Sequence, residues 1–221
     1  MRIFWIFLSL FATFEGLDKM GRVVSLEGEL TAINEKDKRV LELHSDVYVG
    51  DLLITKESSK GQVRFTDGTI VLLIPGSKYR VHSYSSGFFF SKNRFVATLY
   101  NGGIRVTTGL IAQKNPENFE LGTPNATIGV RGTNFEVRIV KGEVFAGCSK
   151  GMISLTNQEG RLSIGPLRPT QFASVFSKES APEALKERPD ALNASLFAPP
   201  EGGLSHEQAG GPSGASINKG C

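Results

Sequence analysis

A short strand followed by a turn that contains glycine is the unit that recurs through most of this 221-residue chain. Between residues 20 and 175, such segments follow one another at a spacing of roughly 8 to 12 residues. They are rich in β-branched residues and phenylalanine, which strands favour, and none shows the period of an amphipathic helix. The pattern predicts an all-β domain. A solenoid, a barrel or a sandwich would each fit, and the spacing alone does not choose among them.

Two of the turns carry an aspartate beside a glycine, at Gly50-Asp51 and at Asp67-Gly68. The second lies between two apolar segments, an arrangement that favours chain reversal. The segment after it, residues 70–74, is apolar throughout, which predicts a strand covered on both faces. Paired carboxylates can serve a hydrolase, but aspartate in such turns accepts hydrogen bonds from nearby backbone N–H groups. We therefore predict structural roles for both acids.

The segment 123–137, TPNATIGVRGTNFEV, has the sequence of two extended stretches joined by a tight corner. Pro124 fixes its own φ and favours an extended conformation for the residue before it. Gly129 and Gly132 give the backbone freedom on either side of a Val-Arg pair. From Phe135 onward, apolar and charged residues alternate as in a half-buried strand.

Arg131 is the one charged residue that this corner could present deliberately. Its guanidinium could form a bidentate contact with a carboxylate of a partner. Alternatively, it could bond carbonyl groups of the turn, or pair with an acid such as Asp67 and hold two chain reversals together. Because glycines suit the close approach of backbones, we favour the structural role, which predicts a loss of thermal stability in Arg131→Ala.

Four elements follow one another along the chain: GDLLIT at 50–55, FTDGT with LIPGS at 65–77, TPNATIGVRGTNFEV at 123–137 and VKGEV at 140–144. In this order they resemble the signature of the FecR domain family, over roughly residues 20–175. The resemblance supplies no catalytic, metal-binding or cofactor-binding residue. It marks as signature or structural residues Gly50, Asp51, Asp67, Gly68, Pro124, Gly129, Arg131, Gly132, Thr133 and Phe135.

The resemblance also implies a fold and a biological setting. The fold would be stacked short strands in a β-helical or solenoid-like arrangement, with a jelly roll or sandwich as the alternative. The best-understood family members are membrane-spanning regulators that relay iron-siderophore signals from an outer-membrane receptor to a sigma factor. They carry a cytoplasmic anti-sigma segment, one transmembrane helix and this domain outside. This chain has a short segment ahead of the domain and no internal apolar run long enough to span a membrane. We therefore expect a stand-alone, exported FecR-domain protein.

Residues 1–16, MRIFWIFLSLFATFEG, have the pattern of a secretory signal peptide. Arg2 supplies the positive charge, and the apolar run 3–14 is shorter than the about 20 residues that a transmembrane helix needs. No A-x-A cleavage site is present, and an uncleaved anchor or a buried strand is the alternative. We predict a periplasmic or secreted protein that contacts the membrane only through this segment, if it stays uncleaved.

Residues 176–221 differ in composition from the rest, because five of the ten prolines lie there and large apolar side chains are sparse. Apart from a turn or two of helix at 181–187, we predict a disordered tail. Cys148 lies in a strand pattern and is predicted to be a small buried residue. Cys221 ends the tail and is predicted to be a free or intermolecular thiol, although an exported chain also permits a bridge between the two.

Several function classes are disfavoured by the sequence. The net charge of +3 is small and the basic residues are scattered, which argues against nucleic-acid binding. The three histidines are far apart and supply no set of metal ligands, and no nucleophile motif or P-loop is present. We therefore expect no enzymatic activity and no cofactor.

The remaining prediction is a sensory or scaffold module in signalling that binds an envelope protein partner. The alternative is a carbohydrate- or cell-wall-binding domain, which needs exposed aromatic side chains to stack against sugars. The candidates for that role are Tyr84, Phe89 and Tyr100.

Overall fold

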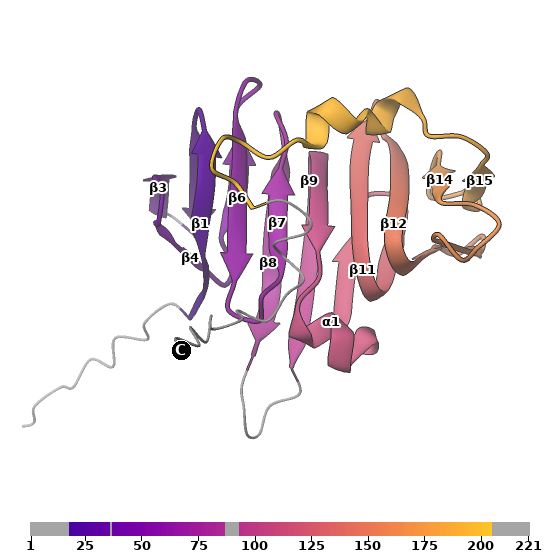
Figure 1. Ribbon diagram of the computed structural model, residues 1–221, viewed down its shortest axis with the longest axis horizontal. Coiled ribbons are helices and arrows are strands. Elements are labelled where there is room, and N and C mark those ends of the chain that lie inside the picture. Colours follow the sequence, from indigo (N-terminus) through magenta and orange to yellow (C-terminus); the bar gives the residue numbers. More distant parts are fainter. Residues whose placement is uncertain (1–17, 36, 87–92, 205–221) are drawn as a thin grey trace, which may run out of the picture.

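The computed structural model describes residues 18–35, 37–86 and 93–204. The predicted signal peptide, Phe89 and Cys221 lie outside these residues. Within them, fifteen strands form one continuous sheet, in which the pairing of β9 (Arg94–Thr107) with β10 (Phe119–Gly122) is parallel. The strands stack side by side along the long axis of the molecule (Figure 1). The prediction of an all-β fold of stacked strands is confirmed.

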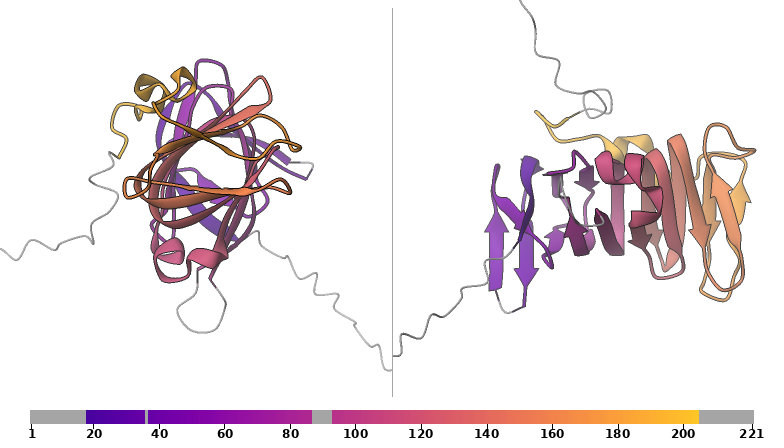
Figure 2. Two further views of the ribbon diagram at one scale, coloured as in Figure 1. Left: turned by 90° about the vertical axis from the view of Figure 1, so that its right-hand side faces the viewer. Right: turned by 90° about the horizontal axis from the view of Figure 1, so that it is seen from below.

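The sheet folds over into two layers that face each other, seen as two curved walls in the view along the long axis (Figure 2). Layer 1 contains β1 (Lys19–Glu27), β4 (Asp46–Tyr48), β6 (Lys60–Phe65), β7 (Ile70–Leu73), β14 (Phe172–Val175) and β15 (Glu183–Leu185). Layer 2 contains β2 (Leu30–Asn34), β3 (Asp37–Leu41), β5 (Leu52–Thr55), β8 (Lys78–Ser85), β10 and β13 (Arg161–Ile164). Three long strands belong to both layers: β9, β11 (Thr127–Val140) and β12 (Glu143–Thr156).

Each long strand passes between the layers at a glycine. Gly102 in β9, Gly132 in β11 and Gly151 in β12 have φ values of 74°, 58° and 76°, a left-handed conformation that favours glycine. Strand β11 pairs with β10 before Gly132 and with the second half of β9 after it. A Cβ on Gly151 would lie 2.2 Å from the carbonyl oxygen of Gly132, so these two bends touch. Segment 123–137 therefore has its corner at Gly132.

The core fills the space between the layers. Its aromatic centre is Phe95, whose ring stacks on Phe119 at 4.5 Å and meets Phe65 edge-on at 5.0 Å. Phe135 of the signature segment is buried in the same cluster. Cys148, which pairs with Phe135 across β11 and β12, is 1% exposed, as predicted for a small buried residue.

The last part of the described chain is ordered where we predicted disorder. Residues 186–204, here called the C-terminal strap, run back along the outer side of layer 1 (Figures 1 and 2). They contain the short 3-10 helices η2 (Asp190–Leu192) and η3 (Ala194–Phe197). Leu192 and Phe197 are fully buried against Leu72 and Ile74. The predicted disorder is therefore wrong for residues 176–204, because this segment pairs through β15 and packs Leu192 and Phe197 on an apolar patch of the sheet.

Two further predictions need adjustment. The helix expected at 181–187 is replaced by the edge strand β15, which pairs with β14. Between β9 and β10, within the domain that we predicted to be all-β, the chain forms α1 (Leu110–Lys114) and the 3-10 helix η1 (Pro116–Asn118). Both are too short to show a helical period in sequence. In the part of the chain that the structure describes, no helix has the length and apolar character needed to cross a membrane.

Candidate functional site

Asp67 is a buried structural acid in the turn between β6 and β7. Its Oδ1 accepts hydrogen bonds from the Thr69 amide at 3.1 Å and the Tyr84 hydroxyl at 3.3 Å. Its Oδ2 accepts from the Thr69 hydroxyl at 2.8 Å and the Ile111 amide at 3.4 Å. The carboxylate thus ties the Asp-Gly turn to β8 and to the start of α1. Burial, with the charge of Asp67, raises the pKa of Tyr84 above its usual range.

Asp51 occupies a separate network at the turn between β4 and β5. The carboxylate is fully buried, and its Oδ2 accepts from Arg39 at 2.6 Å and from the Tyr48 amide at 2.9 Å. The preceding Gly50 has a φ of 87°, which the turn requires. The structure therefore does not bring Asp51 and Asp67 together. Among the described residues, no group of three or more histidine, cysteine, aspartate or glutamate side chains could hold a metal ion.

The first part of the signature segment fixes the chain at one end of layer 2. After Pro124, the side-chain amide of Asn125 donates to the carbonyl oxygens of Gly142, Val175 and Phe176 at 2.7, 3.0 and 3.0 Å. Asn125 therefore joins two separate turns, a role that our sequence reasoning missed. An asparagine beside a proline is the local signal that could have indicated it.

At the corner, Thr133 takes part in the structure through its backbone. Its amide donates to the Thr108 hydroxyl at 2.8 Å, and its carbonyl oxygen accepts from the amide of Thr108 at 3.0 Å. These bonds fasten β11 to the end of β9 immediately after the bend at Gly132.

Arg131 does not pair with Asp67, which was one of the two structural alternatives. Arg131 is exposed on the outer face of layer 2, whereas Asp67 lies in a turn of layer 1 and has other partners. The reason is strand alternation: Val130 faces the core, so its neighbour faces solvent. The structure places Arg131 where the functional alternative requires it.

Arg131 borders a hollow of about 460 Å³ in the outer face of layer 2, here called the arginine hollow. Its floor is formed by Gly129, Met152, Ser154 and Ser163, and four charged side chains surround it. The charged side chains are Glu117, Arg131, Arg161 and Arg168. The hollow is built on β11, β12 and β13 and is closed on one side by η1.

The floor holds two of the arginines loosely. The hydroxyls of Ser154 and Ser163 are hydrogen-bonded to each other at 2.7 Å, and Arg161 donates to the Ser154 hydroxyl at 3.4 Å. Arg168 points to the Met152 sulfur at 3.0 Å. Within the described ranges, none of the three arginines of the hollow forms an ion pair. Their charges are available to an anionic group.

Gly129 contributes open space to the hollow. A Cβ at this position would meet no atom within 4 Å, and its φ is not in the left-handed region. Our prediction that Gly129 supplies backbone freedom therefore does not describe its role, since neither the conformation nor the packing demands glycine. A side chain here would project into the hollow, because residue 129 lies between the core-facing Ile128 and Val130.

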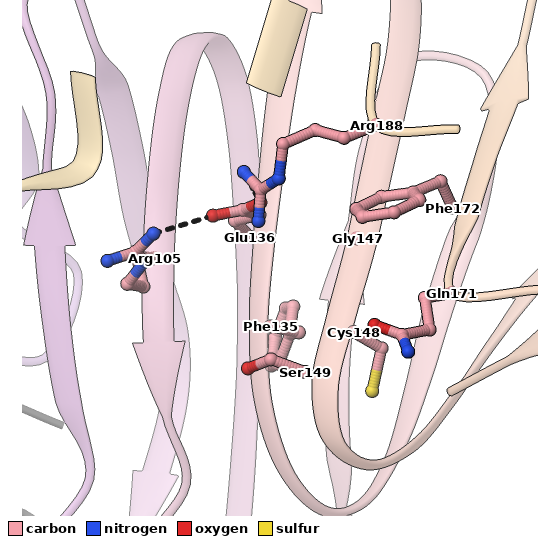
Figure 3. A pocket seen from close by; sticks show the side chains of 9 residues that line it. All are labelled: Arg105, Phe135, Glu136, Gly147, Cys148, Ser149, Gln171, Phe172 and Arg188. Carbon is pink, nitrogen blue, oxygen red and sulfur yellow. Dashed lines mark hydrogen bonds and ion pairs between the residues drawn. The ribbon is translucent and has the colours of Figure 1, made fainter. Parts of the chain in front are cut away.

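A second, smaller cavity of about 180 Å³ lies under the C-terminal strap (Figure 3). Arg105 and Arg188 converge there on the carboxylate of Glu136, at 2.8 and 2.5 Å. Arg188 also lies over the ring of Phe172. The two ion pairs to the single carboxylate fasten the strap to the sheet. The Cys148 thiol lines the same cavity, and burial raises its pKa to about 11, so it stays protonated at neutral pH.

The aromatic side chains proposed for sugar stacking are only partly available. Tyr84 is half-buried and its hydroxyl belongs to the Asp67 network. Tyr100 is 45% exposed and meets the His82 ring edge-on at 6.5 Å. Phe89 lies outside the described residues. Of the three candidates, Tyr100 is the one that the described structure presents to solvent.

Fold and surface together define an all-β domain in which the strap covers part of one outer face and the other outer face carries the arginine hollow. Residues 51–154 match the family model described as FecR protein, so this part of the chain is similar to the FecR domain. The matched region contains Asp51, the Asp-Gly turn at 67–68 and the whole segment 123–137. The resemblance inferred from these motifs is confirmed.

Two crystal structures are similar to this chain, and the one with the higher TM-score shares its fold. Both are of a "putative anti-sigma factor" from Parabacteroides distasonis ATCC 8503. One, at 2.50 Å resolution, has 19% sequence identity and a TM-score of 0.50, and the other, at 1.65 Å, has 20% and 0.49. In each case the alignment covers 65% of this chain and 62% of the other, so the similarity extends over less than two thirds of that protein. No curated protein matches this chain.

Proposed function

We propose that this protein is a non-enzymatic, exported FecR-domain protein that binds a protein partner as a sensory or scaffold module in signalling. The FecR match supports a regulatory setting. The structurally similar protein from Parabacteroides distasonis, described as a "putative anti-sigma factor", supports the same setting at the level of the fold. The N-terminal residues 1–16, with the sequence pattern of a signal peptide, support export to the periplasm or the medium.

The observation that carries the proposal is the difference between the two outer faces. The C-terminal strap covers part of layer 1, where Arg105 and Arg138 donate to its carbonyl oxygens and Glu136 holds its Arg188. The outer face of layer 2 carries the arginine hollow, whose charges have no ion-pair partner in the described part of the chain. Exposed arginines in a concave surface are typical of protein-recognition sites.

The state of the signature acids also favours binding over catalysis. Asp67 accepts four hydrogen bonds from neighbouring groups, and Asp51 is held by Arg39 and a backbone amide. The thiol of Cys148 is buried and protonated at neutral pH. Both carboxylates are buried among structural partners, which leaves them poorly placed for proton transfer with a substrate.

The proposal is tested by affinity capture with the full-length chain. The protein carries a C-terminal tag, is produced in an exporting bacterial host, and is incubated with envelope extract before mass spectrometry of what is retained. A protein that is retained saturably supports the proposal. Retention by peptidoglycan or polysaccharide without an enriched protein would replace it by the carbohydrate-binding alternative, with Tyr100 as the first side chain to examine. N-terminal sequencing of the same material shows whether residues 1–16 are removed.

A further inference from the structure

We propose that the arginine hollow binds an extended acidic peptide segment of the protein partner, with an aspartate or glutamate carboxylate between the three guanidinium groups. This inference rests on the proposed function and adds the chemistry of the partner. It starts from the charges. Arg131, Arg161 and Arg168 border one hollow with a single acid, Glu117. Like charges gathered in a concavity repel each other, and a bound anion removes that cost.

The side chains suit a carboxylate. A guanidinium presents N–H groups in a planar fork that matches the two oxygens of a carboxylate. Arg161 and Arg168 rest on weak acceptors, a serine hydroxyl at 3.4 Å and a methionine sulfur, which a carboxylate can replace at little cost. The Arg131 guanidinium has no hydrogen-bond partner within the described residues and is free to turn toward a ligand.

The floor suits an entering side chain. Gly129, Ser154 and Ser163 lie in one row across β11, β12 and β13, since Gly129 pairs with Ser154 and Ser154 with Ser163. Small residues at three neighbouring strands leave a depression in an otherwise filled sheet surface. Because glycine at 129 is required neither by φ nor by packing, its effect is to keep this depression open. The volume of about 460 Å³ is sufficient for one or two side chains but not for a folded domain.

The surroundings favour a peptide over a polyphosphate. Glu117 lines the hollow, and the exposed Glu120 lies opposite Gly129 in the β10–β11 pairing. These acids would repel a phosphate backbone that runs across the face, yet they leave room for a single carboxylate. Nucleic-acid and anionic-membrane surfaces are instead typically extended basic stripes. We therefore infer a protein partner whose acidic side chain enters the hollow.

The decisive variant is Gly129→Val, which fills the hollow without a predicted cost in folding. The position is extended, its Cβ meets no atom within 4 Å, and valine is favoured in strands. The matched control is Thr127→Val, an exposed outward position on the same strand outside the hollow. Arg131→Ala has its own control in Arg64→Ala, an exposed arginine of β6 on the other layer.

The test uses the full-length protein as bait for a displayed library of random twelve-residue peptides, with counter-selection against Gly129→Val. We expect enrichment of aspartate and glutamate in the retained peptides. The best of them, made synthetically, should lose at least tenfold in affinity with Gly129→Val and with Arg131→Ala but not with either control. Loss with all four variants, or enrichment without acidic residues, overturns the inference. So does stronger binding of oligo(dT) or of phosphatidylglycerol vesicles than of the acidic peptides.

The same variants separate this inference from the proposed function. If the envelope partner is still captured by Gly129→Val, the protein-binding function stands and the hollow is not its site. If no envelope partner is captured by the wild type but acidic peptides bind in the hollow, the chemistry of the hollow stands and the signalling role does not.

Discussion

Phe197→Ala should release the C-terminal strap from layer 1 while leaving the double-layered sheet folded. The Phe197 side chain is fully buried against Leu72 and Ile74, and the Arg105 guanidinium lies over its ring at 5.3 Å. With Leu192, it supplies the buried apolar contacts of the strap. The polar contacts of the strap, such as that from Arg105 to the Phe197 carbonyl oxygen, depend on this docking.

The size of the effect follows from the burial. Truncation of a fully buried phenylalanine costs about 3–5 kcal/mol, of which roughly half is loss of apolar burial and the rest is the cavity left behind. At about 1.4 kcal/mol per factor of ten, even the lower value increases the population of the undocked strap by roughly a hundredfold. The decrease in the global free energy of unfolding is smaller. Once the strap has detached, the sheet stays folded without it, so the loss cannot exceed the free energy with which the strap docks in the wild type.

Hydrogen exchange followed by mass spectrometry is the appropriate assay, together with urea unfolding. Peptides covering 186–204 should lose protection in Phe197→Ala, while those covering β11 and β12 keep theirs. The control is Phe176→Ala, the same substitution at a side chain that is 73% exposed, which should change stability by less than about 0.5 kcal/mol. Unchanged protection of the strap in Phe197→Ala would refute the reasoning. Global unfolding with loss of protection throughout the sheet would show instead that the strap is integral to the fold.

Three further predictions concern the bends, the hollow and the thiol. Gly151→Ala should lower the free energy of unfolding by at least about 2 kcal/mol, because its Cβ would meet the Gly132 carbonyl oxygen at 2.2 Å in a left-handed conformation. Gly142→Ala, with a φ of 86° and open space, should cost only about 1 kcal/mol, and equal losses in urea titrations would contradict the steric argument. Arg131→Ala should leave the melting temperature within about 1 °C of the wild type, and a clear decrease in calorimetry would restore the structural role that we first favoured. Cys148 should resist thiol reagents at neutral pH in the native protein, since its pKa of about 11 keeps it protonated, and it should react on unfolding. Rapid labelling of Cys148 in the native state, measured in a Cys221→Ser background, would contradict its burial.

The parts of this molecule that the sequence predicted well are those determined by local chemistry. The alternation in β11 and the Asp-Gly turn at 67–68 each depend on residues close together in the chain, and their positions follow from backbone geometry. The run 70–74 was expected to be covered on both faces, and Ile70 to Ile74 are all buried. That prediction already implied a covering segment, although nothing local to the run says which one.

The parts that were missed depend on partners far apart in sequence. Leu192 and Phe197 are isolated apolar residues in a proline-rich stretch, and only their contact with Leu72 and Ile74 makes them core residues. In the same way, a pairing of Arg131 with Asp67 was chemically reasonable, but the two residues belong to different layers. No periodicity in the sequence reports which of two stacked layers a turn will join. The role of Gly129 was missed because a glycine in a segment with a second glycine, Gly132, suggests backbone freedom before it suggests empty space.

The bend at Gly132 connects the two faces of the domain. On its N-terminal side, β11 carries Gly129 and Arg131 on the outer face of layer 2, and on its C-terminal side it carries Glu136 under the strap. A strand without the bend could lie in only one layer, and these residues could not serve opposite sides of the molecule. The Gly-Val-Arg-Gly-Thr part of the signature therefore does more than turn the chain. It sets the direction of the free arginine and that of the acid that anchors the strap, so a change in the bend must alter both surfaces together.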